Sequence, residues 1–220
     1  MGHRSVVVVA GGERAAAPPP GLNPDALVIA ADSGADHAYA LGLHIDVAIG
    51  DFDSISPEAL ARAEAEGARI ERHPAAKDKT DLELALDEAI RLDATDIVVL
   101  GVSGGRLDHL LANVLLMASP RFSGCRLTAF DGAVRVHVVH GGEPATPLPG
   151  TPGELVTLLP VGGDATGITI EGLRYPLRGE SLVAGTSRGV SNVVETPEAS
   201  VHIEAGTLLA VFPGQGEADA

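Results

Sequence analysis

The sequence predicts an α/β domain, with a parallel sheet and helices on both of its faces, followed by a small all-β sandwich domain. Over residues 1–140, continuous apolar runs alternate with helical patterns, as in a parallel sheet whose strands are buried on both faces. Residues 141–153 contain four Gly and four Pro, which is typical of a linker or long loop. Over 154–220, short runs rich in Val, Thr, Ile and Leu recur about every eight to twelve residues, which indicates an antiparallel sandwich.

The predicted strands of both domains are short apolar runs bounded by Gly, Pro or Asp. In the α/β domain they cover Ser5–Ala10, Ala26–Ala31, Asp46–Gly50, Ala68–Glu71, Asp96–Leu100 and Arg126–Phe130. In the sandwich domain they cover Glu154–Pro160, Thr166–Leu173, Ser181–Ala184, Ser200–Glu204 and Thr207–Phe212, with no helix among them.

Helices are predicted between the strands from capping residues and apolar stripes. Ser56 precedes Pro57, which is the order of an N-cap and a proline at the first helical position. Thr80 and Glu83 form a capping box, and apolar residues follow at helical spacing. The remaining helices cover Ala35–Leu41 and Arg106–Ala118, and in the second of these we expect a buried stripe of Leu107, Leu110, Leu111 and Val114.

The composition excludes several classes of protein. The chain of 220 residues has a formal net charge of −15 and no basic stripe, so nucleic acid and anionic membranes are poor partners. No run approaches the ~18 apolar residues of a membrane span, and the N-terminus lacks the layout of a signal peptide. The single cysteine, Cys125, cannot form an intrachain disulfide. We therefore expect a cytoplasmic protein.

Four carboxylates follow predicted strands or open a predicted helix. Asp51 and Asp53 come directly after a strand, and in extended chain two such residues face the same way. Asp32 ends the preceding strand, and Asp81 lies in the first turn of the capped helix. Mg²⁺ is usually bound through one or two carboxylates together with substrate phosphates, so we interpret the set as a magnesium site. The plain alternatives are a solvated turn at Asp51–Asp53 and a helix-dipole role for Asp81.

A second candidate site is the glycine-rich turn Gly101–Gly105, which leads into a helix. Its backbone N–H groups could hold phosphate oxygens, although it is neither a Walker A loop nor G-x-G-x-x-G. Arg106 could contact a phosphate, and Asp108 a metal ion or a substrate hydroxyl. The alternatives are a tight turn and two surface charges.

Lysine and histidine are two further candidate residue types for a site. The only two lysines, Lys77 and Lys79, lie in one segment, where they are phosphate contacts or the product of chance in an Arg-rich chain. The eight histidines, His109 among them, show no metal-ligand spacing.

Five segments, in this order, resemble the thiamine pyrophosphokinase family: Ala31–Ala35, Ile49–Ser54, Asp78–Asp81, Gly104–His109 and Ser187–Asn192. The resemblance implies a transferase (a kinase) that moves pyrophosphate from ATP to the hydroxyl of thiamine and gives thiamine diphosphate and AMP. It also implies Mg²⁺, an α/β domain followed by a β-sandwich, and a homodimer with active sites at the subunit interface.

The same resemblance assigns roles to residues by their position. It implies Asp32, Asp51, Asp53 and Asp81 as Mg²⁺ ligands, and Asp51, Asp53, Asp81, Arg106 and Asp108 as catalytic residues. ATP would meet Asp32, Lys79, Thr80, Gly104, Gly105 and Arg106, and thiamine would meet Tyr175, Ser191 and Asn192. Tyr175 stands where animal members carry a Trp that stacks on thiamine, and an Asp of the cluster is the expected general base.

Two other functions compete with this interpretation. One is a Mg²⁺-dependent phosphatase of the haloacid-dehalogenase type, which places an Asp-x-Asp motif after its first strand and carries a later Asp pair. Here the motif follows the third predicted strand, and the chain has no Asp-Asp dipeptide. The other is a non-catalytic regulator that binds a thiamine compound, against which the intact acidic set argues.

Overall fold

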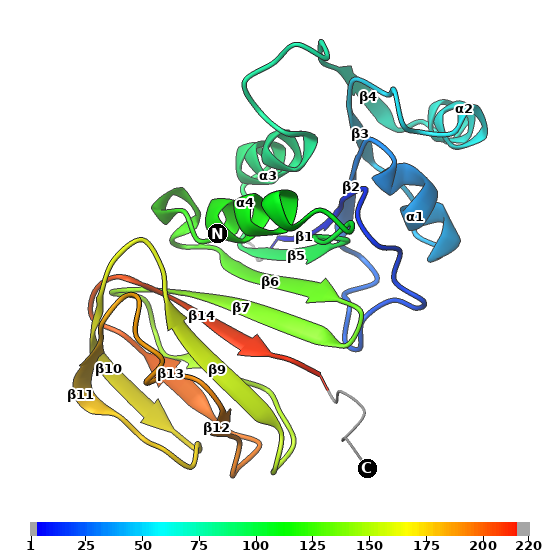
Figure 1. Ribbon diagram of the computed structural model, residues 1–220. Coiled ribbons are helices and arrows are strands. Elements are labelled where there is room, and N and C mark those ends of the chain that lie inside the picture. Colours follow the sequence, from blue (N-terminus) through cyan, green and yellow to red (C-terminus); the bar gives the residue numbers. More distant parts are fainter. Residues whose placement is uncertain (1–3, 215–220) are drawn as a thin grey trace. The chain divides into compact units, whose positions relative to one another are not determined.

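The computed structural model describes residues 4–214, which divide into two compact units (Figure 1). The first unit comprises residues 4–114 and 129–132, and the second comprises 115–128 and 133–214. Helix α4 (Leu107–Met117) and strand β6 (Arg126–Asp131) are divided between them. The domain division at residues 140 and 153 stays a prediction, although β7 (Val134–His140) pairs with β14 (Thr207–Phe212) and groups with the second unit.

The first unit contains a parallel sheet in the order β5-β1-β2-β3-β4. The chain runs outward from β1 to β4 and then continues with β5 on the other side of β1, so the strand order reverses between β1 and β5. Open α/β sheets bind ligands beyond the carboxyl ends of the strands at such a reversal. All five strands match predicted runs to within about two residues: β1 (Ser5–Val9), β2 (Leu27–Ala31), β3 (Val47–Gly50), β4 (Arg69–Arg72) and β5 (Asp96–Leu100).

Helices cover both faces of this sheet, as predicted. Because successive side chains of a strand point to opposite faces, alternate valines of β1 pack on different helices. Val7 and Val9 share a core with residues of α1 (Gly34–Ala40) and α2 (Pro57–Ala65). Val6 and Val8 are fully buried on the opposite face, and α3 (Asp81–Arg91) contacts β1, β2 and β3.

The two predicted helix caps are present. The Ser56 hydroxyl accepts a hydrogen bond from the Ala59 N–H at 3.1 Å, and the Thr80 hydroxyl accepts one from the Glu83 N–H at 3.2 Å. Each cap satisfies a backbone donor that the first helical turn leaves without a partner. The Thr80 cap fixes where α3 begins and therefore where Asp81 lies. Among residues 4–214, no helix has the length and apolar character needed to cross a membrane.

Helix α4 corrects one prediction. Leu107 and Leu111 are 68% and 54% exposed, and Leu110 and Val114 are half-buried, so the stripe is not the buried face that we expected. Helical spacing shows that these residues share a side of the helix, but it does not show that anything packs against that side. In the described chain Leu107, Leu111 and the likewise exposed Leu115, each one turn apart, form an apolar surface on α4.

The second unit is an antiparallel β-sandwich, as predicted. One sheet has the order β12-β9-β14-β7 and the other has the order β11-β10-β13-β8. Val156, Leu158 and Phe212 of the first sheet share one buried core with Ile168 and Val201 of the second. The remaining elements are η1 (Pro120–Phe122), β8 (Thr146–Pro147), β9 (Leu155–Pro160), β10 (Ala165–Glu171), β11 (Arg178–Leu182), β12 (Asn192–Val193) and β13 (Ser200–His202).

Candidate active site

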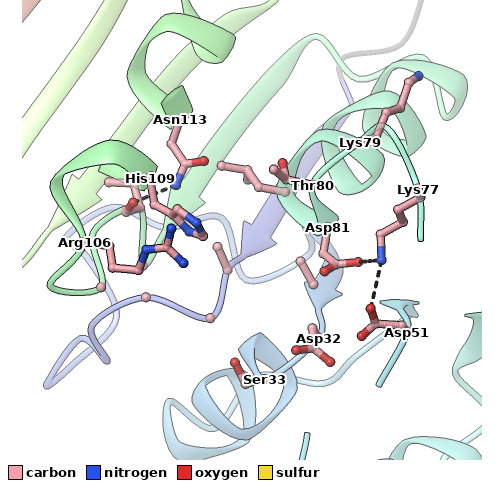
Figure 2. Close-up of a pocket in the computed structure, with 18 of the residues that line it drawn as sticks. Asp32, Ser33, Asp51, Lys77, Lys79, Thr80, Asp81, Arg106, His109 and Asn113 are labelled. Atoms are coloured by element: carbon pink, nitrogen blue, oxygen red, sulfur yellow. Dashed lines mark hydrogen bonds and ion pairs between the residues drawn. The ribbon is translucent and has the colours of Figure 1, made fainter. Parts of the chain in front are cut away.

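A cavity of about 400 Å³ lies at the carboxyl ends of β1, β2, β3 and β5 in the first unit (Figure 2). It therefore includes the point where the strand order reverses. Its wall contains seven of the residues that the sequence assigned to the site: Asp32, Asp51, Lys79, Thr80, Asp81, Gly104 and Arg106. The wall also contains Lys77, which the sequence offered only as a phosphate contact, and residues that the sequence did not assign, among them Gly11, Gly12, His109 and Asn113. Asp53, Gly105 and Asp108 are not on this wall, and Tyr175, Ser191 and Asn192 belong to the second unit.

Backbone from two glycine-containing loops forms part of the wall. The Gly12 N–H donates a hydrogen bond to the Gly101 carbonyl oxygen at 3.1 Å, which joins the loop after β1 to the loop after β5. A side chain at Gly12 would collide with the Ser103 carbonyl oxygen, and Gly101 has a φ of +73° that favours glycine. Backbone can therefore approach a ligand closely here. The missed signal was Gly11-Gly12 directly after a buried strand.

Asp32, Asp51 and Asp53 meet at the edge of the cavity. Each offers a carboxylate oxygen, and the three oxygens lie within 4.8 Å of one another. We expected Asp51 and Asp53 to lie in extended chain, but Phe52 between them has a φ of +61°. Asp32 also has a positive φ, of +48°. Non-glycine residues seldom adopt this conformation, and it occurs often at functional sites.

The three carboxylates of Asp32, Asp51 and Asp53 together fit a divalent cation. The Oδ1 atom of Asp32 is buried and has no hydrogen-bond partner in the part of the chain that the structure describes. A buried carboxylate oxygen without a partner is costly, and a hard cation such as Mg²⁺ would supply the missing interaction. The donor set of three carboxylate oxygens is of the type that Mg²⁺ takes.

The pKa values of these carboxyl groups differ in direction. Burial raises the pKa of Asp32, and the charges of Asp81 and Asp53 raise it further against the hydrogen bonds from the Ser33 and Ser54 backbone. The Asp53 backbone N–H lowers the pKa of Asp51, and Lys77 adds to this effect against a smaller effect of burial. The charge of Asp32 is therefore disfavoured where it lies, and a cation beside it would relieve this.

Lys77 joins two of the acidic residues. Its ammonium lies 2.9 Å from Asp81 Oδ1 and 3.3 Å from Asp51 Oδ2, and its side chain is only 12% exposed (Figure 2). Burial lowers the pKa of Lys77, but the hydrogen bonds and charges of Asp81 and Asp51 outweigh burial and raise the pKa above its ordinary value. Lys79 also lines the cavity, but its ammonium pairs with Asp87 at 2.7 Å.

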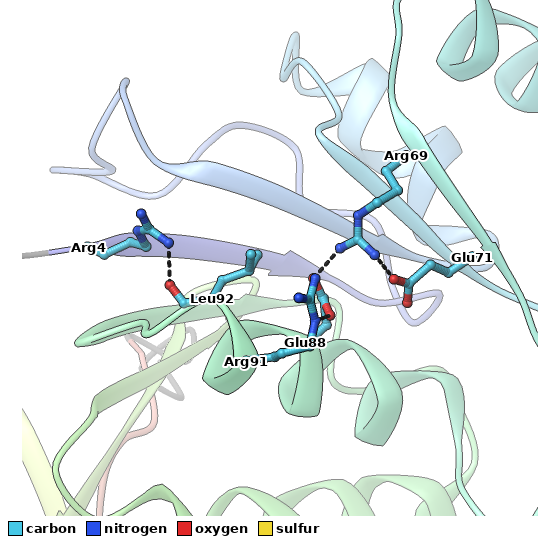
Figure 3. Close-up of polar contacts among 6 residues, drawn as sticks. All are labelled: Arg4, Arg69, Glu71, Glu88, Arg91 and Leu92. Atoms are coloured by element: carbon cyan, nitrogen blue, oxygen red, sulfur yellow. Dashed lines mark hydrogen bonds and ion pairs between the residues drawn. The ribbon is translucent and has the colours of Figure 1, made fainter.

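Helix α3, which carries Asp81 at its start, is anchored near its other end. The buried carboxylate of Glu88 accepts hydrogen bonds from Arg91 at 2.6 Å and from Arg69 of strand β4 (Figure 3). Arg4 donates a hydrogen bond to the Leu92 carbonyl oxygen at 2.5 Å, directly after the helix. These contacts tie α3 to the sheet and so restrict the movement of Asp81.

The start of α4 supplies the opposite side of the cavity. Figure 2 shows Arg106 and His109 together, across the cavity from Asp32 and Asp51. Arg106 forms two hydrogen bonds with Asp108, at 2.7 and 3.2 Å, and this interaction lowers the pKa of Asp108 to about 2. The sequence signals for His109 were its place in the segment Gly104–His109 and its spacing three residues after Arg106, which puts both on one side of a helix.

A second cavity, of about 270 Å³, lies in the second unit and includes Tyr175, Arg188 and Asn192 in its wall. Tyr175 is 62% exposed, whereas Asn192 is buried. The Asn192 Oδ1 atom accepts hydrogen bonds from the N–H groups of Tyr175, at 3.0 Å, and Val193, at 2.8 Å. Its Nδ2 donates to the Tyr175 carbonyl oxygen at 2.9 Å. Ser191 is not in this wall, and its backbone N–H donates to the Thr157 hydroxyl at 3.1 Å.

In this parallel α/β sheet, three carboxylates and two glycine-containing loops lie where the strand order reverses. This arrangement is typical of proteins that bind a metal ion with a phosphate ligand. Comparison with known proteins gives the family. Residues 21–129 match the family described as thiamin pyrophosphokinase, catalytic domain, and residues 145–208 match the one described as thiamin pyrophosphokinase, vitamin B1 binding domain. The chain belongs to the thiamine pyrophosphokinase family.

Individual relatives agree with this assignment. The thiamine pyrophosphokinase of Bacillus subtilis is 27% identical over 216 residues, which cover 94% of this chain and 98% of the relative. A crystal structure of thiamine pyrophosphokinase from Bacillus subtilis aligns with a TM-score of 0.83 at 26% identity and covers 97% of this chain and 100% of that one. A thiamin pyrophosphokinase family protein from Enterococcus faecalis aligns with a TM-score of 0.78 at 28% identity, over 97% of this chain and 100% of that one. These matches favour the pyrophosphokinase over the phosphatase and the non-catalytic regulator.

Proposed function

We propose that this protein transfers a pyrophosphate group from ATP to the hydroxyl of thiamine and releases AMP. In such a transfer the hydroxyl oxygen attacks the β-phosphorus of ATP, and AMP leaves with the bridging oxygen. The observation that carries the proposal is the carboxylate group of Asp32, Asp51 and Asp53 at the reversal point of the sheet, in a chain that matches both domains of the family. Against the phosphatase, the Asp-x-Asp motif follows β3 rather than the first strand.

Asp32, Asp51 and Asp53 would hold Mg²⁺, with Asp81 close by. When bound, the ion would neutralise phosphate charge and orient the triphosphate, which is most of what catalysis of phosphoryl transfer requires. The backbone of Gly12 and Gly104 would approach the phosphate oxygens, and Arg106 would offset negative charge on the other side of the cavity. Lys79 and Thr80 line the same cavity and complete the proposed ATP contacts.

One of the carboxylates would also accept the proton of the thiamine hydroxyl. The pKa of Asp32 is raised and that of Asp51 is lowered, so Asp32 accepts a proton more readily than Asp51. Asp108 has a different proposed role, which is to hold Arg106 in place. Its low pKa keeps its carboxylate charged, and this charge binds the Arg106 guanidinium.

The cavity of the second unit would take thiamine. Tyr175 presents an exposed aromatic ring at this cavity, and flat cationic rings are attracted to aromatic faces. Asn192 lies in the wall of this cavity, and Ser191 precedes it in the segment that resembles the thiamine loop of the family.

A homodimer with active sites between subunits completes the proposal. The apolar surface of Leu107, Leu111 and Leu115 on α4 supports it, since exposed contiguous leucines commonly mark a protein interface. A second copy of the chain is the occupant that we propose for this surface.

The test of the proposed function is release of AMP from ATP and Mg²⁺, with and without thiamine. We expect AMP only when thiamine is present. Release of inorganic phosphate without AMP would support the phosphatase instead, and tight thiamine binding without AMP would support the regulator.

A further inference from the structure

One lysine lies inside the acidic site, and its contacts are different from those of its neighbour. Lys77 is almost buried, and its ammonium contacts both Asp51 and Asp81. Lys79, two residues later, is half exposed and pairs with Asp87, which is outside the carboxylate group. The two lysines therefore have different roles, although the sequence places them in the same short segment.

The position of the Lys77 ammonium is one that a cation with carboxylate ligands would take. Asp51 and Asp81 approach it from two elements, the end of β3 and the start of α3. Without the ammonium, these two carboxylates would face each other with no cation between them, which is unfavourable for like charges. Asp51 also belongs to the group that includes Asp32 and Asp53, so its carboxylate contributes to both positions.

We propose that Lys77 is a positioning residue whose ammonium takes the place of a second divalent cation between Asp51 and Asp81. The site then holds one divalent ion on Asp32, Asp51 and Asp53, while Lys77 ties the start of α3 to the end of β3. This inference rests on the proposed function for the presence of a divalent cation. Beyond that function, the inference states how many divalent ions the site holds and that Lys77 determines this number.

The test counts Mn²⁺ bound to the full chain by electron paramagnetic resonance, without nucleotide or thiamine. Lys77→Met keeps the length of the side chain and removes its charge. We expect this variant to bind one more Mn²⁺ per chain than the wild type at the same free Mn²⁺ concentration. Lys77→Gln is measured beside it and is expected to gain the same ion, so that a folding defect of one variant leaves the test intact.

Three variants serve as controls for this count. Lys79→Met removes a neighbouring lysine that does not contact the site carboxylates, and it should match the wild type. Lys77→Arg keeps the positive charge and should also match it. The double variant Lys77→Met/Asp81→Asn should lose the extra ion, because one of its two carboxylates is gone.

The inference is overturned if neither Lys77→Met nor Lys77→Gln gains an ion, or if Lys79→Met gains one as well. The ion counts need neither substrate, so they are independent of the proposed reaction. A chain that shows the expected counts and forms no AMP with thiamine would reject the proposed function and leave the role of Lys77 in place. A chain that forms AMP with thiamine but does not show the expected ion counts would reject only the role of Lys77.

Discussion

The side-chain amide of Asn192 forms hydrogen bonds with both backbone polar groups of Tyr175. Its Oδ1 accepts from the Tyr175 N–H at 3.0 Å, and its Nδ2 donates to the Tyr175 carbonyl oxygen at 2.9 Å. The sequence assigned Asn192 to thiamine itself. The structure uses both of its polar atoms within the chain, so we now propose that Asn192 acts on thiamine through the position of Tyr175.

Replacement of Asn192 by Ala should therefore lower both stability and thiamine affinity. A buried backbone group left without its partner costs about 1–3 kcal/mol, so we expect the free energy of unfolding to fall by roughly that amount. Asn192→Asp keeps an acceptor for the Tyr175 N–H but sets an oxygen against the Tyr175 carbonyl oxygen, so it should not restore the wild-type stability. Urea unfolding and the KM for thiamine would measure these effects, and an unchanged KM in a folded Asn192→Ala protein would contradict the positioning role.

Replacement of Tyr175 by Ala should affect thiamine alone. Stacking of a ring on an aromatic side chain is worth roughly 1–3 kcal/mol, so the KM for thiamine should rise on the order of ten- to a hundredfold. The KM for ATP and the thermal stability should change little, because the Tyr175 side chain is largely exposed. Tyr175→Phe is the matched control and should behave as the wild type. Equal kinetics of the Ala and Phe variants would remove Tyr175 from the thiamine site.

Replacement of Asp32 by Asn should separate function from folding. Asn tolerates the positive φ of this position, while the change removes a charge that burial and the neighbouring Asp81 and Asp53 disfavour. In EDTA the midpoint of urea unfolding should rise. With Mg²⁺ the turnover should fall at least about a hundredfold, since loss of even an indirect metal partner costs 10–100-fold.

The exposed Asp25 provides the control for this change, because Asp25→Asn removes the same charge outside the site. Near-normal turnover of Asp32→Asn, or a lower unfolding midpoint in EDTA, would show that Asp32 is a structural residue.

Much of the fold could be predicted because its signals are local. The hydroxyl of Thr80 caps α3 as its sequence pattern indicates, and the five parallel strands match their predicted ranges closely. Strands β8 and β12 were missed because two residues are too few to form a pattern. Strand β7 was also missed, because Arg135, His137 and His140 interrupt its apolar residues.

The site could be predicted only in part, for a different reason. The carboxylates Asp32 and Asp51 follow strands directly, and strand ends of a parallel sheet meet at one edge, so their approach follows from the topology. The contact of Lys77 with Asp81 depends on the path of the loop before α3, which no sequence period encodes. The exposure of Leu107 likewise depends on what packs against α4, which helical spacing does not show.

Replacement of Glu88 by Gln should destabilise the first unit and reveal how α3 is held. Burial alone would raise the pKa of Glu88, but hydrogen bonds and charges of Arg91 and Arg69 outweigh it and lower the pKa below its ordinary value. A carboxyl group with a lowered pKa contributes stability above the pKa of the unfolded chain and loses it as the pH falls through the folded pKa. We expect a loss of about 1–3 kcal/mol at pH 7, typical of hydrogen bonds to a charged group.

This loss should shrink as the pH falls below about 4.3, the ordinary pKa of a glutamate, because the wild type then loses the same contribution. Glu66→Gln is the control, since Glu66 pairs with Arg62 on the surface of the molecule and such pairs contribute little. Urea unfolding as a function of pH would measure both variants. A difference between Glu88→Gln and the wild type that is constant with pH would contradict the ionic role.

Replacement of Leu111 by Lys should change the oligomeric state. If a second copy covers the apolar surface of α4, a charge at its centre should convert a dimer into a monomer. Light scattering after size exclusion would give the two masses. The exposed Val183 lies outside this surface, so Val183→Lys should leave the dimer intact. A wild type that is monomeric at all concentrations would reject the dimer, as would a dimeric Leu111→Lys variant.

In the proposed reaction both phosphates move to thiamine together, so the identity of the products decides whether it takes place. Purified protein is incubated with ATP, Mg²⁺ and thiamine, and the nucleotides and thiamine compounds are separated and quantified over time. We expect AMP and thiamine diphosphate in equal amounts from the earliest time points, with neither product formed by Asp51→Asn. Formation of ADP with thiamine monophosphate, or of inorganic phosphate in place of thiamine diphosphate, would contradict it.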